Sequence, residues 1–289
     1  MDHKVGGANG SVVQSSTFTY DEQNRVTSGY GQTFSWKNNG DIDLFAGLGY
    51  TYDPIHPHAV NTVGGVDRFD YNLNGSMSVR KTGAVTQTLR WDSRNQLAQV
   101  TWGSPVQNEY YGYDEGGRRV AKAFVSGGST VMTYYPFVHY EQTGSSGAGV
   151  TKYYFFGGER FAMRTGSGAG VLRFLYQDHL SSTVHVTDGA GATVAGRGYY
   201  AFGATMRSTG TMPTNHLFTD QQQDASGLYY YGARYYDPAI GHFISPDTIA
   251  VSYTHLRAHE TVLDLVCRLL LEKKKKNTRK YHSLTSYIH

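Results

Sequence analysis

Residues 69–77 read Phe-Asp-Tyr-Asn-Leu-Asn-Gly-Ser-Met, a pattern that recurs along the first part of the chain. Phe69 and Tyr71 are separated by one residue, so their aromatic side chains lie on the same face of a strand. The segment 72–75 then favours a tight turn, because Asn and Gly tolerate left-handed backbone. Met77 opens a returning strand. We interpret the unit as two strands joined by a turn, with one apolar face.

Similar units recur along the first 125 residues. In each, an aromatic residue precedes a polar turn residue, and an Asn or Gly usually follows within the turn. The spacing of roughly 16 to 22 residues is the length of one two-stranded unit. Such hairpins are marginal alone, so we expect them to pair side by side into one long, coiling sheet. The aromatic residues of the six copies are Tyr20, Trp36, Tyr52, Tyr71, Trp91 and Tyr113, and the copy at Tyr52 is degenerate.

The composition agrees with an all-β chain. It includes 24 Tyr, 13 Phe and 35 Gly, with only 17% charged residues. Aromatic residues favour strands, and frequent Gly favours turns over long helices. We therefore predict an all-β fold in which hairpins coil into an incomplete spiral sheet or shell with exposed edges. The low-complexity stretches Thr143 to Gly149 and Thr165 to Gly170 are predicted to be hairpin loops.

Charge and cysteine content exclude several function classes. The formal net charge is +3, but bases outnumber acids by 8 to 3 after Ile249, and the part before it is slightly acidic. We therefore predict no nucleic-acid partner. The single cysteine, Cys267, leaves the part before Ile249 without a thiol for a disulfide. No apolar run of membrane-spanning length occurs, and Met1 to Gly10 do not resemble a signal peptide.

Three groups of residues invite a chemical interpretation, and each is also typical of a turn. His56-Pro57-His58 could begin a metal site, but no partner ligand follows at the usual spacing. Asp178, His179, Ser181 and Ser182 have the side chains of a hydrolase triad, yet neighbours on a strand point to opposite faces. The run 166–170 lacks the lysine of a phosphate loop. We predict no metal and no cofactor.

The second half contains longer motifs. Residues 113–122 read Tyr-Asp-Glu-Gly-Gly-Arg-Arg-Val-Ala-Lys, and residues 227–238 read Gly-Leu-Tyr-Tyr-Tyr-Gly-Ala-Arg-Tyr-Tyr-Asp-Pro, followed by Gly-His-Phe-Ile-Ser-Pro-Asp at 241–247. These strings resemble the Rhs/YD-repeat family and its core module, although His242 stands where that family usually has Arg. The signature positions are Gly227, Leu228, Tyr229, Tyr230, Gly232, Arg234, Tyr235, Tyr236, Asp237, Pro238, Gly241, Phe243, Pro246 and Asp247.

The resemblance implies three parts: YD (Rhs) repeats at 1–109, the repeat-associated core domain at 110–249, and a separate tail at 250–289. It also implies a β-shell that encloses a C-terminal effector polypeptide, usually a toxin, until delivery. The implied partners are that effector and, in the full-length protein, secretion machinery or surface carbohydrate. The full-length protein is expected to be secreted or associated with the cell surface, as a structural module rather than an enzyme.

The resemblance also raises self-cleavage, because Asp247 resembles one of the acids that release the effector in related proteins. Such hydrolysis needs two carboxylates that share a proton. The family's continuation, which ends in Asp-Pro-x-Gly-Leu, does not follow Asp247, so we expect a non-enzymatic fragment without its effector. A self-cleaving toxin precursor and a carbohydrate-binding adhesion protein stay as alternatives. The direction of the aromatic side chains distinguishes shell from adhesion protein.

The last segment differs in amino-acid composition from the part of the chain before it. Residues 251–261 read Val-Ser-Tyr-Thr-His-Leu-Arg-Ala-His-Glu-Thr, which resembles the translation of a transposon-derived sequencing adapter. Residues 264–272 and the lysines that follow resemble the adapter's later constant part. We predict that residues 250–289 are an adapter-derived artefact, disordered or loosely helical, with no evolved function.

Overall fold

The computed structural model describes residues 2–6 and 12–247, and side chains from Thr17 onward. Regular structure in this part consists of β-strands and two short 3₁₀ turns. The predicted tail at 250–289 lies outside the described residues. A first hairpin pairs β1 (Asp2–Gly6) with β2 (Val12–Thr17). A seven-stranded sheet then comprises β3 (Thr19–Tyr20), β4 (Val26–Gly29), β5 (Gln32–Trp36), β6 (Ile42–Phe45), β7 (Leu48–Tyr52), β8 (Val60–Val63) and β9 (Val66–Asp67).

A fourteen-stranded sheet continues the chain without a change of pattern. Its strands are β10 (Phe69–Tyr71), β11 (Met77–Thr82), β12 (Val85–Trp91), β13 (Leu97–Trp102), β14 (Gln107–Tyr113), β15 (Arg119–Ser126), β16 (Ser129–Phe137), β17 (Tyr140–Thr143), β18 (Val150–Phe156), β19 (Glu159–Thr165), β20 (Val171–Gln177), β21 (Thr183–Asp188), β22 (Thr193–Tyr199) and β23 (Thr205–Thr209). The 3₁₀ turn η1 (Gly147–Gly149) lies between β17 and β18. Both predicted low-complexity loops therefore join neighbouring strands.

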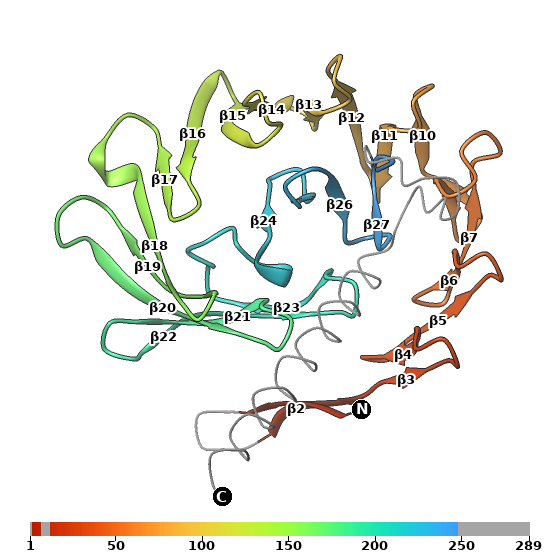
Figure 1. Ribbon diagram of the computed structural model, residues 1–289, viewed down its shortest axis with the longest axis horizontal. Coiled ribbons are helices and arrows are strands. Elements are labelled where there is room, and N and C mark those ends of the chain that lie inside the picture. Colours follow the sequence, from red (N-terminus) through yellow and green to blue (C-terminus); the bar gives the residue numbers. More distant parts are fainter. Residues whose placement is uncertain (1, 7–11, 248–289) are drawn as a thin grey trace, which may run out of the picture.

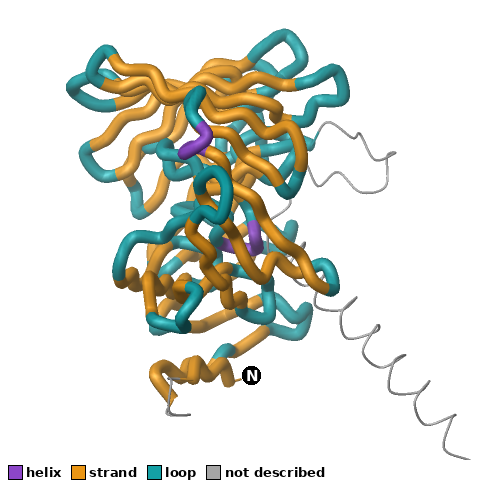
Figure 2. Tube along the Cα trace, turned by 90° about the vertical axis from the view of Figure 1, so that its left-hand side faces the viewer, coloured by secondary structure: helices purple, strands orange, loops and turns teal. Residues whose placement is uncertain are grey.

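The strands from β3 to β23 form what we call the wall. Each strand pairs antiparallel with its sequence neighbour, in unbroken chain order within each sheet. Figure 1 shows that the wall curls through a wide arc, and Figure 2 shows from the side that loops join the strands at both rims. The predicted coiling all-β sheet is confirmed. The wall begins with β3, an edge strand of the seven-stranded sheet, and ends with β23, an edge strand of the fourteen-stranded sheet.

A small sheet lies inside the arc (Figure 1). It contains β24 (Gln222–Gln223), β25 (Tyr229–Tyr230), β26 (Tyr235–Asp237) and β27 (His242–Phe243), and the 3₁₀ turn η2 (Phe218–Asp220) precedes it. We call residues 214–247 the central module. The wall thus encloses the segment that carries the signature residues of the second half of the chain.

The recurring turn has a definite hydrogen-bond pattern, seen clearly at Asn72. Its Oδ1 accepts from the backbone N–H groups of Asn74 and Ser76, both at 3.0 Å. Gly75 supplies the left-handed position with φ of 75°, and the strand register shifts beside Tyr71. This is a turn followed by a β-bulge, the geometry that short polar side chains and Gly favour. Carboxylate oxygens accept the equivalent pair of backbone N–H bonds at Asp21, Asp92, Asp178 and Asp188.

The aromatic residue before each turn ties one repeat to the preceding one. Trp91 Nε1 donates to the carbonyl oxygen of Met77 at 2.7 Å, and Tyr71 OH donates to that of Val60 at 2.7 Å. These bonds join residues of adjacent units that strand pairing alone does not connect. Equivalent bonds run from Trp36 to Val26, Tyr52 to Ile42, Tyr113 to Leu97 and Tyr199 to Thr183.

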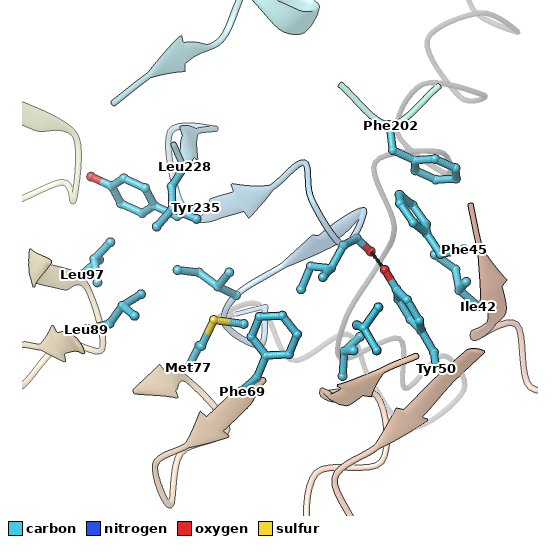
Figure 3. Close-up of a cluster of buried hydrophobic side chains, with 14 of the residues drawn as sticks. Ile42, Phe45, Tyr50, Phe69, Met77, Leu89, Leu97, Phe202, Leu228 and Tyr235 are labelled. Atoms are coloured by element: carbon cyan, nitrogen blue, oxygen red, sulfur yellow. Dashed lines mark hydrogen bonds between the residues drawn. The ribbon is translucent and has the colours of Figure 1, made fainter. Parts of the chain in front are cut away.

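The main hydrophobic core lies between the wall and the central module (Figure 3). The wall residues Ile42, Met77 and Leu97 are fully buried there, in one cluster with Leu228 and Ile244 of the central module. Two hydrogen bonds join the same surfaces: Met77 N donates to the Ile244 carbonyl at 2.8 Å, and Tyr50 OH contacts the Ile240 carbonyl at 3.4 Å. Burial of this apolar surface fixes the module inside the arc.

Candidate functional site: a buried ionic seam

Charged side chains also connect the wall to the central module. Four wall cations, Arg80, Arg119, Lys122 and Arg160, are largely buried, although charged residues are seldom buried unless paired. Their partners are carboxylates of the central module. We call the whole set the seam: Arg80, Glu109, Arg119, Lys122, Glu141 and Arg160 from the wall, with His216, Asp220, Gln222, Asp224 and Asp237 from the central module.

The first contact of the seam joins β11 to β26. Arg80 Nε and Nη2 donate to the two carboxylate oxygens of Asp237 at 2.6 and 2.7 Å. Arg80 Nη1 also donates to Gln87 Oε1 at 2.8 Å, and the Gln87 amide donates to the Ser226 carbonyl at 2.8 Å. The two-point geometry matches the planar guanidinium to the carboxylate. It therefore fixes both the position and the angle of β26.

The centre of the seam is Arg119, at the start of β15. Its Nη1 donates to Asp224 Oδ2 at 2.5 Å, and its Nη2 donates to Gln222 Oε1 at 2.6 Å. The guanidinium lies 4.4 Å from the ring centroid of Tyr230. Three more tyrosine rings surround it at 5.1 to 5.9 Å: Tyr111, Tyr135 and Tyr235. Aromatic faces stabilise a cation that has lost its water, so the cage offsets part of the cost of burial.

Lys122 completes a balanced group of charges. Its ammonium lies 2.7 Å from Asp224 Oδ1 and 3.5 Å from Glu109 Oε1. Glu109 in turn accepts from the backbone N–H groups of Ala225 and Ser226 at 3.0 and 2.9 Å. Two cations and two carboxylates thus meet in a buried volume. A buried charge is tolerated when it is paired and hydrogen-bonded in this way.

The far end of the seam lies between β17, β19 and η2. Arg160 Nε donates to Asp220 Oδ1 at 2.9 Å. Glu141 Oε1 lies 3.1 Å from His216 Nε2 and accepts from the Gln222 amide at 2.8 Å. Because Gln222 also binds Arg119, one network of hydrogen bonds and ion pairs runs from Glu109 to Glu141. Its wall residues belong to three strands, β14, β15 and β17.

The pKa values show which charges this network stabilises. Burial by itself raises the pKa of Asp224, but Arg119 and Lys122 outweigh burial and hold it below its ordinary value. The same holds for Glu141: burial raises its pKa, but the hydrogen bond and charge of His216, together with Arg160 and Gln222, hold it below its ordinary value. Burial lowers the pKa of Lys122, but Asp224 keeps it above the ordinary value. These groups stay ionised at neutral pH, as suits a fixed ionic contact.

The structure places the predicted signature residues in different roles. Asp237 belongs to the seam, and the rings of Tyr229, Tyr235 and Tyr236 are buried. Asp247 lies after a bend at Ile244 and Ser245, 3.2 Å from Arg234. Arg234 also lies 4.0 Å from the ring centroid of Phe243. The expectation that Asp247 has no catalytic role without the family's continuation stays untested.

The other candidate residues occupy turns and separate contacts. Asp178 and Ser182 belong to a turn in which the carboxylate binds backbone N–H groups, as the sequence predicts. His56 contacts Asp53 at 3.2 Å, whereas His58 contacts Asp41 at 2.8 Å. In residues 2–6 and 12–247, no three His, Cys, Asp or Glu side chains are grouped so that they could hold a metal ion. No helix of this part is long and apolar enough to cross a membrane.

Eight of the eleven seam residues were missed by the sequence interpretation. They did not stand out, because each is a polar or charged residue that a strand or turn could equally present to water: Arg80, Glu109, Glu141, Arg160, His216, Asp220, Gln222 and Asp224. Arg80 offers one weak signal of burial. A β-bulge places it on the same face of β11 as the apolar Met77. Only the folded wall brings these groups to the central module.

Curated proteins similar to this chain include bacterial toxin proteins. The chain is 27% identical over 193 residues to toxin subunit YenC1 of Yersinia entomophaga, which covers 56% of this chain and 19% of that protein. It is 31% identical over 189 residues to the tRNA nuclease WapA of Bacillus subtilis (strain 168), which covers 63% of this chain and 8% of that protein. The chain thus spans less than a fifth of either relative. No protein-family model matches the sequence.

Solved structures share the architecture. The TcdB2-TccC3-Cdc42 structure has a TM-score of 0.70 and 22% identity, over 88% of this chain and 15% of the matched chain. A Photorhabdus luminescens Tc holotoxin pore, carrying a TccC3 mutation, has a TM-score of 0.61 and 18% identity, over 88% of this chain and 16% of that one. The curled wall with its central module is therefore a fold found in toxin complexes, and this chain is similar in sequence to toxin subunits.

Proposed function

We propose that the chain is a Rhs/YD-repeat protein segment that forms part of a shell for a toxic or other effector polypeptide. The observation that carries this proposal is the buried seam, which anchors the central module across five wall strands. A buried contact of this kind suits a shell whose central module must stay fixed against the wall. The family motifs at 227–238 and the similarity to toxin subunits support the same function.

The parts proposed for this shell are repeats at 1–109 and a core domain at 110–249. Tyr110 lies inside β14, and the sheet continues across it, so the division is one of motif type within a continuous wall. The proposed partner is the protein's own effector, in a full-length protein that is secreted or associated with the cell surface. Nuclease activity belongs to the WapA relatives, and we propose no enzymatic role for residues 1–249.

Long-read sequencing of the parent DNA across the codon for Ala250, followed by limited proteolysis of the full-length product, tests the proposal. If the frame continues into a further domain, we expect that domain to resist protease while the shell is intact. Replacing Arg119 by Met should expose it, because the module loses its central contact. Rapid digestion in the unaltered protein, or a genomic frame that encodes Val251 to His289 and then stops, would contradict encapsulation.

A second candidate, carbohydrate binding, has one specific observation in its favour. Tyr135 and Tyr153 face the seam, so the adjacent Tyr134 and Tyr154 point away from it and are 45% and 38% exposed. Exposed tyrosine rings can stack on sugars. A glycan array tests this function, with the Tyr134→Ala/Tyr154→Ala variant as its control. Carbohydrate binding predicts a glycan signal that the variant loses. A purely structural wall predicts no such difference between the two proteins.

A further inference from the structure

The two ring nitrogens of His216 have neighbours of different kinds. Nδ1 lies 3.0 Å from the backbone carbonyl oxygen of Asp220. A carbonyl oxygen only accepts hydrogen bonds, so Nδ1 must carry a hydrogen. Nε2 lies 3.1 Å from Glu141 Oε1 and 3.2 Å from Gln222 Nε2. The ionised carboxylate only accepts, whereas the amide nitrogen only donates.

The orientation of the Gln222 amide is set by a third residue. Its Oε1 accepts from Arg119 Nη2 at 2.6 Å, so its Nε2 points towards Glu141 and His216. A protonated His216 ring therefore donates from both nitrogens and binds Glu141. A neutral ring, with its hydrogen on Nδ1, presents a lone pair that repels Glu141 and can only accept from Gln222.

We propose that His216 is a proton-operated latch between the central module and β17 of the wall. With the proton, the ring completes an ion pair with Glu141 across the boundary. When the proton leaves to solvent, Nε2 transfers its contact to Gln222, which belongs to the central module itself, and the ion pair between His216 and Glu141 across the boundary is lost. The same atoms thus support a docked and a loosened arrangement.

The surrounding charges favour the protonated ring. Asp220 Oδ1 lies 4.0 Å from Nδ1, and Arg160 pairs with that same carboxylate. Glu141 and Asp220 together require two positive charges for balance, and Arg160 supplies only one of them. His216 supplies the second when it is protonated. The titratable and charged groups around the ring are Glu141 on β17, Tyr153 on β18, Arg160 on β19 and Asp220 on η2, with Arg119 on β15 reaching it through Gln222.

The direction of the pH response follows from the number of protons bound in each arrangement. The docked arrangement binds one proton more than the loosened one at His216, so acid favours docking. Rising pH favours loss of that proton to solvent. The latch should therefore hold in mildly acidic solution and loosen as the pH becomes alkaline, while the wall keeps its pairing.

Nitrogen-detected NMR and amide hydrogen exchange of the full chain test this inference, with the His216→Gln variant used to assign the ring signals. We expect both ring nitrogens to carry hydrogen at pH 6. After correction for intrinsic exchange, opening of residues 214–223 should rise roughly tenfold between pH 6 and 8.5, while β12 and β13 stay unchanged. The matched variant Glu141→Gln keeps the side-chain shape and should abolish that rise. A neutral ring at pH 6, or an equal rise in Glu141→Gln, would overturn the latch.

Discussion

Arg80 and Asp237 are 157 positions apart in the chain, yet they form a two-point ion pair that is almost completely buried. Arg80 belongs to the wall, and Asp237 ends β26 of the central module. Folding therefore has to bring a repeat from the first half of the chain against a signature residue from its end. This ion pair forms only when the central module is docked on the wall, so it is a single contact by which docking can be measured.

Replacing Arg80 by Met should destabilise the chain by about 3–5 kcal/mol, because it leaves Asp237 charged and buried without its partner. Adding Asp237→Asn should recover part of the loss by removing that charge. The control is Arg94→Met, since Arg94 is half-exposed, lies 3.8 Å from Asp92 and should contribute at most about 1 kcal/mol. Urea denaturation measures all three, and equal losses at Arg80 and Arg94 would show that burial is not the cause.

The aromatic contacts between repeats give a second prediction. Tyr71→Phe removes the hydroxyl that donates to the Val60 carbonyl and leaves that oxygen buried without its hydrogen bond. We expect a loss of about 1–3 kcal/mol in the free energy of unfolding. Tyr110→Phe is the matched control, because it deletes the same atom from a ring that is 43% exposed. If both variants unfold at the same denaturant concentration, the bond does not stabilise the repeat.

Turn glycines offer a comparison within one residue type. Gly75 and Gly40 both have positive φ, 75° and 91°, so Ala at either position should cost about 1 kcal/mol of backbone strain. An added Cβ at Gly75 would also lie 3.1 Å from both His56 and Pro246, whereas at Gly40 it would meet nothing within 4 Å. Gly75→Ala should therefore cost roughly 1 kcal/mol more than Gly40→Ala. Equal thermal shifts would mean that the end of the central module moves aside freely.

Much of the wall could be predicted from sequence, because its structure is decided locally. The segment 72–75 contains the residues that a bulged turn requires, and Phe69 and Tyr71 show the period of two that places them on the core side. Each repeat carries the same information, so strand order follows from chain order. The degenerate copy at Tyr52 still forms its turn, with the Asp53 carboxylate bound to backbone N–H groups.

The seam could not be predicted in the same way, because no local rule distinguishes its residues. Arg118 and Arg119 are neighbours with the same side chain, yet Arg118 lies half in solvent and Arg119 is fully buried among four tyrosine rings. Strand alternation explains that their directions differ, but not which one faces the central module. That choice depends on Asp224, 105 positions later, and so on tertiary structure.

Acid should loosen the seam through its carboxylates. The pKa values of Asp224 and Glu141 lie below their ordinary values of 3.8 and 4.5, with burial opposed by the neighbouring cations. A carboxylate with a lowered pKa in the folded state contributes stability that is complete above its unfolded pKa and is lost as pH falls through the folded value. We therefore expect no contribution from these groups to the pH dependence above about pH 5, and a loss of stability below about pH 4.

Glu141→Gln isolates one of these carboxylates, because the amide keeps the shape and cannot titrate. Denaturation at several pH values between 6 and 3 should show a lower stability for the variant at pH 6, where it lacks the ion pair with His216. Its stability should then fall less steeply with acid, by up to about 1.4 kcal/mol per pH unit, since one fewer proton is taken up on unfolding. Parallel curves for the two proteins would place the acid response elsewhere, with Asp224 and the other wall-to-module carboxylates as the remaining sources.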